Sequence, residues 1–160
     1  MEQPSDIVVS AATLERMQQE LTELETSGRE EMGNRLRKAR ELGDLSENAD
    51  YHAAREAQGL MEARIRTLKH MIANAVVREG PAEAEEAQLG VIVSILDKES
   101  GDRDDYLLAS STEEKAPGIR TITTGSPLGS ALVGRKAGET VTVAAPAGQF
   151  EVEILEIRPA

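Results

Sequence analysis

Two helical repeats of seam residues, separated by a short polar stretch, constrain the fold of this chain more than any other feature. In the second repeat the seam positions recur at alternating steps of four and three residues without a break. That spacing places one stripe of side chains along a single helix face, and a partner helix must cover such a stripe. The stripe consists of Ala54, Gln58, Met61, Ile65, Leu68, Ile72 and Ala75.

The first repeat supplies the partner helix. It follows Ser10, a residue type that caps helix N-termini, and Val9 and Leu14 stand at the positions of a hydrophobic staple around that cap. The seam weakens at Gly28 and resumes in a shifted phase. Because a glycine inside a helix costs about 1 kcal/mol relative to alanine, packing against the second helix must offset it. The seam residues are Leu14, Met17, Leu21 and Leu24 before the shift, and Met32, Leu36 and Ala39 after it.

The two seams predict an antiparallel coiled-coil hairpin, because a short polar turn returns the second helix along the first. Helices of about 30 residues would be ~45 Å long at 1.5 Å per residue. The turn between them, residues 43–50, has the sequence GDLSENAD. It is therefore expected at the far end of a long, narrow arm.

Three carboxylates gather in this turn: Asp44, Glu47 and Asp50. One explanation is local, since Asp and Asn favour turns and acids stabilise helix N-termini. The other is chemical, because Asp44 and Glu47 on one side of a turn would offer the oxygen ligands that Mg²⁺ prefers. The ion takes about six ligands, so these acids are too few to hold it alone. The pattern thus leaves two hypotheses, a solubilising decoration and half of a metal site that another molecule completes.

Charge and composition exclude some classes of binding partner. A net charge of −11 disfavours nonspecific binding to duplex DNA, which needs a basic face. The local exception runs from Arg35 to Arg40, and its simplest interpretation is a solvated helix face. The chain has no cysteine, no signal-peptide pattern and no apolar stretch near the ~20 residues of a membrane span. We therefore expect a cytoplasmic protein with no membrane partner.

Catalysis by the chain alone finds little support in the sequence. It contains no glycine-rich phosphate loop, no nucleophile elbow and no Cys/His pair. His52 and His70 are separated by about 27 Å along a helix, so they cannot share a metal ion, and we expect both to be exposed. Tyr51 is expected to pack against the tip or to contact a partner there.

The second half predicts a small α+β domain. Residues 78–88 contain a Gly-Pro break and four Glu, and they are expected to form an extended, solvated linker. Short β patterns follow from residue 89, and a short helix is predicted from Leu128 to Val133. The last β pattern changes phase at Leu155, where we expect a bulge or a twist. The predicted strands are GVIVSIL, DDYLLAS, IRTITT, ETVTVAA and FEVEILEI.

Two segments resemble a known family. Residues 38–68, KARELGDLSENADYHAAREAQGLMEARIRTL, resemble the helical hairpin of bacterial Gre-type transcript cleavage factors, and the likeness points to the GreA subfamily. Residues 126–143, SPLGSALVGRKAGETVTV, resemble the C-terminal domain of the same factors. The acidic tip followed by YHAARE is the most specific motif. The resemblance implies three parts: a coiled-coil hairpin at 1–77 with its acidic tip at 43–50, a linker at 78–88, and an FKBP-like α+β domain at 89–160.

The resemblance also implies a partner and a role. The partner is bacterial RNA polymerase, and the role is that of a transcription elongation factor that is not itself an enzyme. In the family the hairpin enters the secondary channel of the polymerase and stimulates endonucleolytic cleavage of backtracked RNA in the polymerase active site. Asp44 and Glu47 match the family's tip acids, which share Mg²⁺ with the polymerase. Arg40 and Arg55 match positions that meet the RNA 3′ end.

Further expectations concern docking and assembly. Ser126, Pro127 and Leu128 match the segment with which the family docks on the polymerase, although a helix-capping turn would have the same sequence. No cofactor of the chain's own is expected, and we expect a monomer. Ser46 departs from the family, since many relatives carry Lys or Arg there. Its effect on RNA or polymerase contact is left open.

Three alternatives remain beside the cleavage factor. A relative with an altered tip would block the channel as an inhibitor, but the intact GDLSEN argues against this. The FKBP-like topology would suit a prolyl isomerase, but Tyr106 and Phe150 are too few aromatic residues for its pocket. In the third alternative the chain is a coiled-coil adaptor whose acids only solubilise the tip.

Overall fold

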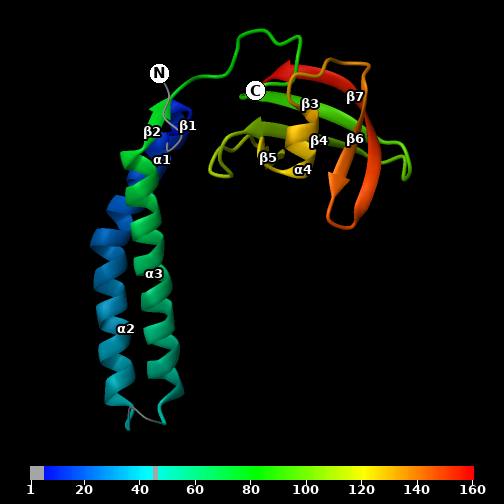
Figure 1. Cartoon of the computed structure of the whole chain (residues 1–160). Helices are drawn as coiled ribbons and strands as arrows, with labels where there is room; N and C mark the ends of the chain where they lie inside the picture. The colour runs from blue at the N-terminus through cyan, green and yellow to red at the C-terminus, as the bar shows by residue number, and fades with distance from the viewer. Residues whose placement is uncertain (1–5, 45–46) are drawn as a thin grey trace. The chain divides into compact units, whose positions relative to one another are not determined.

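The computed structural model describes residues 6–44 and 47–160. It confirms the predicted α+β fold, in which a helical hairpin precedes a sheet-bearing part along the chain (Figure 1). Two compact units result: Leu14–Ala75 forms one, and the residues up to Thr13 join Val76–Ala160 in the other. This division into two units does not test the domain limits predicted from the sequence, which stay a prediction.

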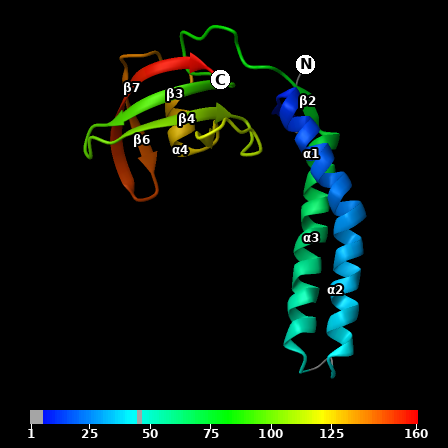
Figure 2. The ribbon, with the colours of Figure 1, turned by 180° about the vertical axis from the view of Figure 1, so that it is seen from behind.

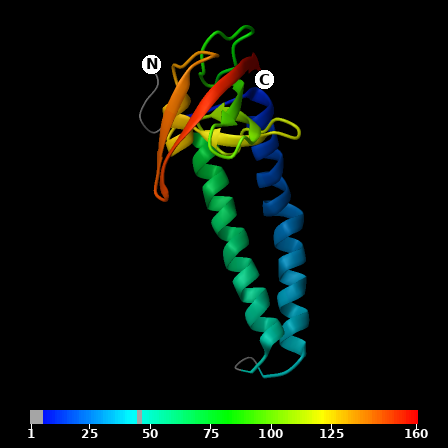
Figure 3. The same ribbon diagram turned by 90° about the vertical axis from the view of Figure 1, so that its right-hand side faces the viewer.

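The hairpin consists of two helical segments that run antiparallel and side by side, and three views agree on this (Figures 1, 2 and 3). The second segment is α3, whose 25 residues correspond to about 37 Å at 1.5 Å per residue. The tip therefore lies at one end of a long two-helix arm. The segments are α1 (Ala11–Glu23), η1 (Leu24–Gly28) and α2 (Arg29–Glu41), which are continuous, and α3 (Ala49–Ala73).

The π-helical turn η1 explains the shifted seam of the first segment. A π turn inserts one extra residue into the helical repeat. The seam step from Leu24 to Met32 is accordingly eight residues, one more than a heptad. Gly28 closes the turn against α3, where an added Cβ would lie 3.5 Å from Sδ of Met61. The predicted seam is confirmed by the buried residues Met17, Leu36, Ala39, Ala54, Ile65 and Leu68.

Ion pairs between the two segments flank this turn. Arg29 donates two hydrogen bonds to Glu62, both at 3.0 Å. Arg64 donates two to Glu20 at 2.7 and 2.8 Å, and these bonds are the main reason that the pKa of the Glu20 carboxyl lies below its usual value. Exposed ion pairs contribute little to the free energy of folding, but bidentate contacts between arginine and a carboxylate are geometrically specific. They therefore help to fix the register of α3 against the first segment.

A short strand at the start of the described chain was not predicted. β1 (Ile7–Val9) pairs with β2 (Ala75–Val77) in a two-stranded sheet. Ser10 caps α1 as predicted, since its hydroxyl oxygen accepts the N–H of Thr13 at 3.2 Å. The N–H of Ser10 donates to Glu114 at 2.6 Å. In a capping box, a glutamate three residues after the cap, here at position 13, would accept this N–H. Thr13 stands there, and Glu114 accepts the N–H in its place.

The second unit contains a five-stranded sheet with the order β5-β4-β3-β7-β6. Its neighbours are antiparallel except β4 and β5, which are parallel. The predicted bulge is confirmed, because the β3–β7 register shifts between Ser94 and Ile95 and the pairing skips Leu155. The strands are β3 (Val91–Asp97), β4 (Arg103–Ala109), β5 (Arg120–Thr123), β6 (Thr140–Ala145) and β7 (Gly148–Pro159).

Helix α4 (Pro127–Leu132) packs against this sheet (Figures 1 and 2), and its Leu132 is fully buried in the core. The linker prediction is wrong at the end of the predicted segment. Ala87 is only 1% exposed, and its N–H donates to the carbonyl of Arg135 at 2.8 Å. The four glutamates nearby made this segment look solvated, yet its alanines are small enough to pack onto the core. The predicted likeness to FKBP domains stays a prediction.

A polar network lies across the central strands of the sheet. The hydroxyl of Ser94, a fully buried residue, donates to Asp105 at 2.5 Å. Arg158 donates to Ser94 at 3.0 Å and to the second carboxylate oxygen of Asp105 at 3.1 Å. The bond from Ser94 and then the bond from Arg158 lower the pKa of the Asp105 carboxyl. The ionised form of Asp105 is therefore the one that the fold favours.

Asp105→Asn should weaken the acid dependence of this unit's stability. A carboxyl with a lowered folded pKa stabilises the fold above its unfolded pKa, and the contribution is lost as the pH falls through the folded value. The loss should thus begin near the ordinary value of 3.8 and continue below it. Urea unfolding at pH 7 and pH 3, followed by amide signals of β3, would measure it. Asp104→Asn removes the same charge from the neighbouring residue and serves as the control. If both variants reduce the difference in stability between pH 7 and pH 3 equally, the result would contradict the network.

Candidate functional site

The two acids predicted to share a metal stand at the two ends of one turn at the hairpin tip. The N–H of Glu47 donates to the carbonyl oxygen of Asp44 at 3.3 Å. Both side chains are exposed. The backbone therefore brings the two carboxylates to the same end of the arm and presents them outward. Residues 45–46, which include the family departure Ser46, lie outside the described residues.

The ends of α2 and α3 hold this turn. Gly43 follows α2 with a φ of +139°, a conformation that favours glycine. α3 begins after Asn48, whose side-chain oxygen accepts the N–H of Tyr51 at 3.0 Å. The side-chain nitrogen of Asn48 donates to the carbonyl of Ala39 in α2. Asn48 therefore bonds to both helices. The sequence analysis gave it no role, although an Asn just before a helical pattern is a known capping signal.

The two cations predicted to meet RNA flank the tip on different helices. The guanidinium of Arg40, in the last turn of α2, lies 5.7 Å from the ring centroid of the half-buried Tyr51. That contact agrees with the packing interpretation of Tyr51. Arg55, in α3, donates to Gln58 at 2.6 Å. Three further cations of α2, Arg35, Arg37 and Lys38, are also exposed.

Within 6–44 and 47–160 no helix combines the length and apolar character that a membrane crossing requires. Over the same ranges no three His, Cys, Asp or Glu residues form a group that could hold a metal ion. His52 and His70 are both exposed on α3, as predicted.

The predicted docking segment is first of all a helix cap. The hydroxyl oxygen of Ser126 accepts the N–H of Gly129 at 3.0 Å, and the hydroxyl donates to the carbonyl of Thr123 at 2.7 Å. Leu128 packs against the hydrophobic core. Pro127, at the first helical position, is the exposed member of the predicted set. Two of the three predicted residues thus have structural roles, and Pro127 is available to a partner.

The exposed side of α4 adds residues that the sequence analysis missed. Pro127 and Ser130 are three residues apart and share one side of α4, and Val133 follows the last helical residue; all three are exposed. Val133 is 44% exposed. The only signal for it in the sequence is its position at the end of the helix predicted from Leu128 to Val133. We call Pro127, Ser130 and Val133 the α4 surface.

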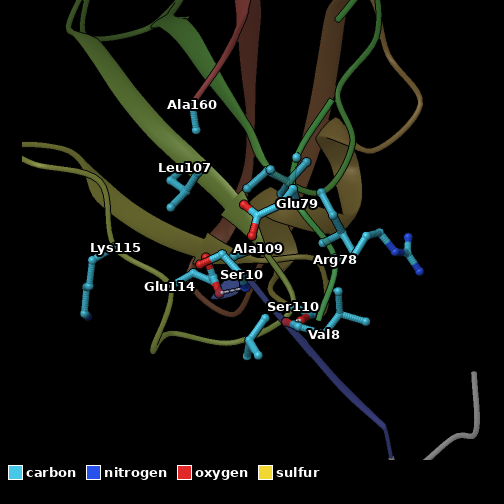
Figure 4. A pocket seen from close by; sticks show the side chains of 15 residues that line it. Val8, Ser10, Arg78, Glu79, Leu107, Ala109, Ser110, Glu114, Lys115 and Ala160 are labelled. Carbon is cyan, nitrogen blue, oxygen red and sulfur yellow. Dashed lines mark hydrogen bonds between the residues drawn. The ribbon is translucent and has the colours of Figure 1, made fainter. Parts of the chain in front are cut away.

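A cavity of about 290 Å³ lies in the second unit beside the start of α1. Figure 4 shows the carboxylates of Glu79 and Glu114 near Ser10. Glu114 accepts the N–H of Ser10 at 2.6 Å, and Glu79 accepts the N–H of Ala11 at 2.9 Å. Both acids therefore stabilise the N-terminus of α1. We interpret the cavity as a structural feature of the cap.

Comparison with protein families gives the assignment. Residues 7–77 match the family described as "Transcription elongation factor, N-terminal", and residues 82–159 match the one described as "Transcription elongation factor, GreA/GreB, C-term". The chain belongs to the GreA/GreB family of transcription elongation factors. The family predicted from GDLSEN and SPLG is confirmed, and so is the role as a transcription elongation factor.

Individual members of the GreA/GreB family match nearly the full length. Transcription elongation factor GreA of Caldanaerobacter subterraneus subsp. tengcongensis is 37% identical over 153 residues, which cover 95% of this chain and 97% of the relative. The GreA factor of Bacillus subtilis is 36% identical over 157 residues, covering 98% and 99%. The GreA factor of Amoebophilus asiaticus is 40% identical over 145 residues, covering 90% and 92%. These matches favour the elongation factor over the inhibitor alternative.

Proposed function

We propose that this chain enters the secondary channel of bacterial RNA polymerase and stimulates endonucleolytic cleavage of backtracked RNA, which rescues arrested complexes. It acts as a monomer in the cytoplasm and activates the polymerase in trans. The observation that carries the proposal is the turn that joins Asp44 to Glu47 at the exposed tip of a two-helix arm. An arm of about 37 Å suits a reaction centre at the bottom of a channel.

A Mg²⁺ ion shared with the polymerase fits the donors at this tip. Asp44 and Glu47 provide carboxylate oxygens, the ligand type that this ion prefers, and both are exposed. Two carboxylates leave most of the coordination sphere to other groups, which suits a site completed by the polymerase and the RNA. When bound, the ion would activate water and stabilise the charge that develops on the phosphate.

The chain's own side chains then have separate tasks. Asp44 and Glu47 would hold the ion, and their carboxylate oxygens would orient the attacking water by accepting its hydrogen bonds. Arg40 and Arg55, which flank the tip, contact phosphates of the extruded RNA 3′ end. The stacking of Arg40 on Tyr51 limits the motion of its guanidinium before RNA arrives.

Cleavage in a backtracked elongation complex tests the proposal. Added chain should accelerate shortening of the RNA by at least about tenfold over polymerase alone, a difference of ~1.4 kcal/mol in activation free energy. A complex held in the forward register provides the control, since it has no extruded RNA to cut. If the chain binds the polymerase and leaves cleavage unchanged or slower, the cleavage role is wrong and the channel-blocking inhibitor is the better explanation.

Docking on the polymerase is expected to use the α4 surface. A charge at Leu128 would disturb the core, so the test leaves this residue unchanged. Pro127→Ala combined with Val133→Asp changes only exposed residues. It should weaken binding to polymerase by about tenfold or more, because an apolar contact at an interface centre is replaced by a charge.

A direct binding measurement with labelled chain and core polymerase checks this expectation. Ala137→Asp, an exposed change just beyond the α4 surface, adds the same single negative charge and serves as the control. Equal affinity of the Pro127, Val133 variant and the unmodified chain would refute the docking surface and leave Ser126 to Leu128 as a structural turn.

A further inference from the structure

Asn48 occupies a position that neither the family matches nor the proposed mechanism explains. It is half-buried at the tip, directly after Glu47, with an extended backbone that precedes α3. Its backbone carbonyl accepts the N–H of His52 at 3.1 Å, as expected of an N-cap residue. Its side chain does more than cap α3. The oxygen and the nitrogen of the side-chain amide form hydrogen bonds with two different helices.

The oxygen of this amide accepts the N–H of Tyr51 at 3.0 Å, within α3. The nitrogen donates to the carbonyl of Ala39, within the last turn of α2. That carbonyl belongs to the four at a helix C-terminus that lack a regular helical partner, and it also accepts the N–H of Leu42 at 3.2 Å. One side chain thus satisfies a donor at the start of α3 and an acceptor at the end of α2.

We propose that Asn48 is a positioning residue that fixes the separation of the two helix ends and thereby the relative placement of Asp44 and Glu47. Both acids lie in the loop that Asn48 closes, since that loop leaves α2 after Glu41 and enters α3 at Ala49. With the ends of the two helices held together, Asp44 and Glu47 keep a constant separation. The proposal rests on the proposed function, because the placement matters only if both carboxylates serve one ion.

The chemistry explains why this residue is Asn. Asp and Ser both cap helices well, so α3 alone would accept either. Asp has no donor for the carbonyl of Ala39 and would bring a negative charge against it. Ser carries a donor, but its side chain is shorter than an amide and must choose between the two helices. Of the three side chains, only the amide carries its acceptor and its donor on two separate atoms, so that one faces Tyr51 while the other faces Ala39.

Asn48→Asp and Asn48→Ser therefore separate two roles of the side chain. One is its hydrogen bond to the carbonyl of Ala39, which we call the tie, and the other is the cap of α3. In both variants the N–H of Tyr51 should keep its protection from hydrogen exchange, because the cap acceptor remains. Binding to polymerase should be unchanged, while RNA cleavage at saturating chain should fall by about tenfold or more through altered placement of the acids. Asn74→Asp, the same amide-to-acid change at the other end of α3, should cleave like the unmodified chain.

A readout independent of cleavage is the side-chain amide of Asn48 in nuclear magnetic resonance spectra of the isolated chain. Its proton bonded to Ala39 should exchange with water more slowly than the side-chain protons of the exposed Asn34. Fast exchange would overturn the tie whether or not the chain stimulates cleavage. If the unmodified chain fails to stimulate cleavage, the proposed function fails while the tie is still judged by this exchange rate.

Three further outcomes would overturn the positioning role. Cleavage at the unmodified rate in both Asn48 variants would show that the tie has no effect on the acids. Loss of cleavage together with loss of Tyr51 protection would reduce Asn48 to a helix cap. Loss in Asn48→Asp alone would assign the effect to the added charge. Loss in both variants with Tyr51 still protected is the result that supports the proposal.

Discussion

The double variant Asp44→Asn, Glu47→Gln should lose at least about a hundredfold of the stimulated RNA cleavage rate, while its affinity for polymerase stays nearly unchanged. Each amide keeps the shape of its acid and removes the charge that attracts the ion. Disorganising one ion of a two-metal site costs several kcal/mol, and ~1.4 kcal/mol corresponds to a factor of ten in rate. Single-turnover cleavage of labelled RNA in a backtracked complex measures the loss.

Asp50→Asn is the matched control for this prediction. Asp50 is an exposed acid in the first turn of α3, so it carries the same charge close to the same tip. We assign it only a favourable interaction with the helix N-terminus, worth roughly 0.3–1 kcal/mol. Its variant should cleave within a few-fold of the unmodified chain. An equal loss in Asp50→Asn would mean that total negative charge matters, as it would in an adaptor or a channel plug.

Gly129→Ala should strongly destabilise the unit that contains the sheet. A Cβ at this position would lie 1.9 Å from the carbonyl oxygen of Thr123 and 3.0 Å from the hydroxyl oxygen of Ser126. The first contact is with backbone, which cannot move aside without pulling β5 away from α4. We expect a cost above the usual 1–3 kcal/mol of an overpacked core site, a large share of the ~5–15 kcal/mol that stabilises a typical domain.

Gly125→Ala provides a matched control four positions earlier, because an added Cβ there meets nothing within 4 Å. Its stability should change by less than about 1 kcal/mol. Urea unfolding of the full chain measures both variants, with amide signals of β3 for this unit and helical circular dichroism for the hairpin. Gly129→Ala should lower the midpoint of the β3 signals and leave the hairpin transition in place. Equal midpoints for the two alanine variants would contradict the close packing of α4 on β5.

The predictable part of the fold is the part with strict periodicity. The steps of four and three from Ala54 to Ala75 predicted α3, and the alternation that ends at Leu155 predicted β7 with its bulge. The phase shift near Gly28 was visible in the sequence, but its cause was not. A shift of one residue fits a kink, a break or a π turn, and only the backbone of Leu24–Gly28 distinguishes them.

The features that were missed depend on contacts between residues distant in sequence. β1 is only three residues long, too short for a periodic signal, and it exists because β2 pairs with it. Ala87 was assigned to a linker because its neighbours are glutamates, whereas its burial depends on the loop around Arg135. In each case the local composition gave no sign of the partner.

The candidate site also contains features that the sequence predicts and features that it does not. The acids of the tip were predicted from residue types and from the family motif, and the turn from Asp44 to Glu47 places them together. The capping role of Ser126 and the packing of Leu128 were left open, because a docking loop and a helix cap share the same residues. The tie of Asn48 to Ala39 spans two helices, so no pattern in either helix predicts it.

The Mg²⁺ dependence of cleavage is the measurement that tests most directly whether the tip acids serve a shared ion. Cleavage rates in a backtracked complex are followed over a range of Mg²⁺ concentrations, with the unmodified chain and with the Asp44→Asn, Glu47→Gln variant, each saturating the polymerase. We predict that the unmodified chain reaches half-maximal cleavage at a lower Mg²⁺ concentration, and that raised Mg²⁺ partly restores the variant because a weakened site still fills by mass action. Near-normal rates for the variant at low Mg²⁺ would contradict the metal role of Asp44 and Glu47.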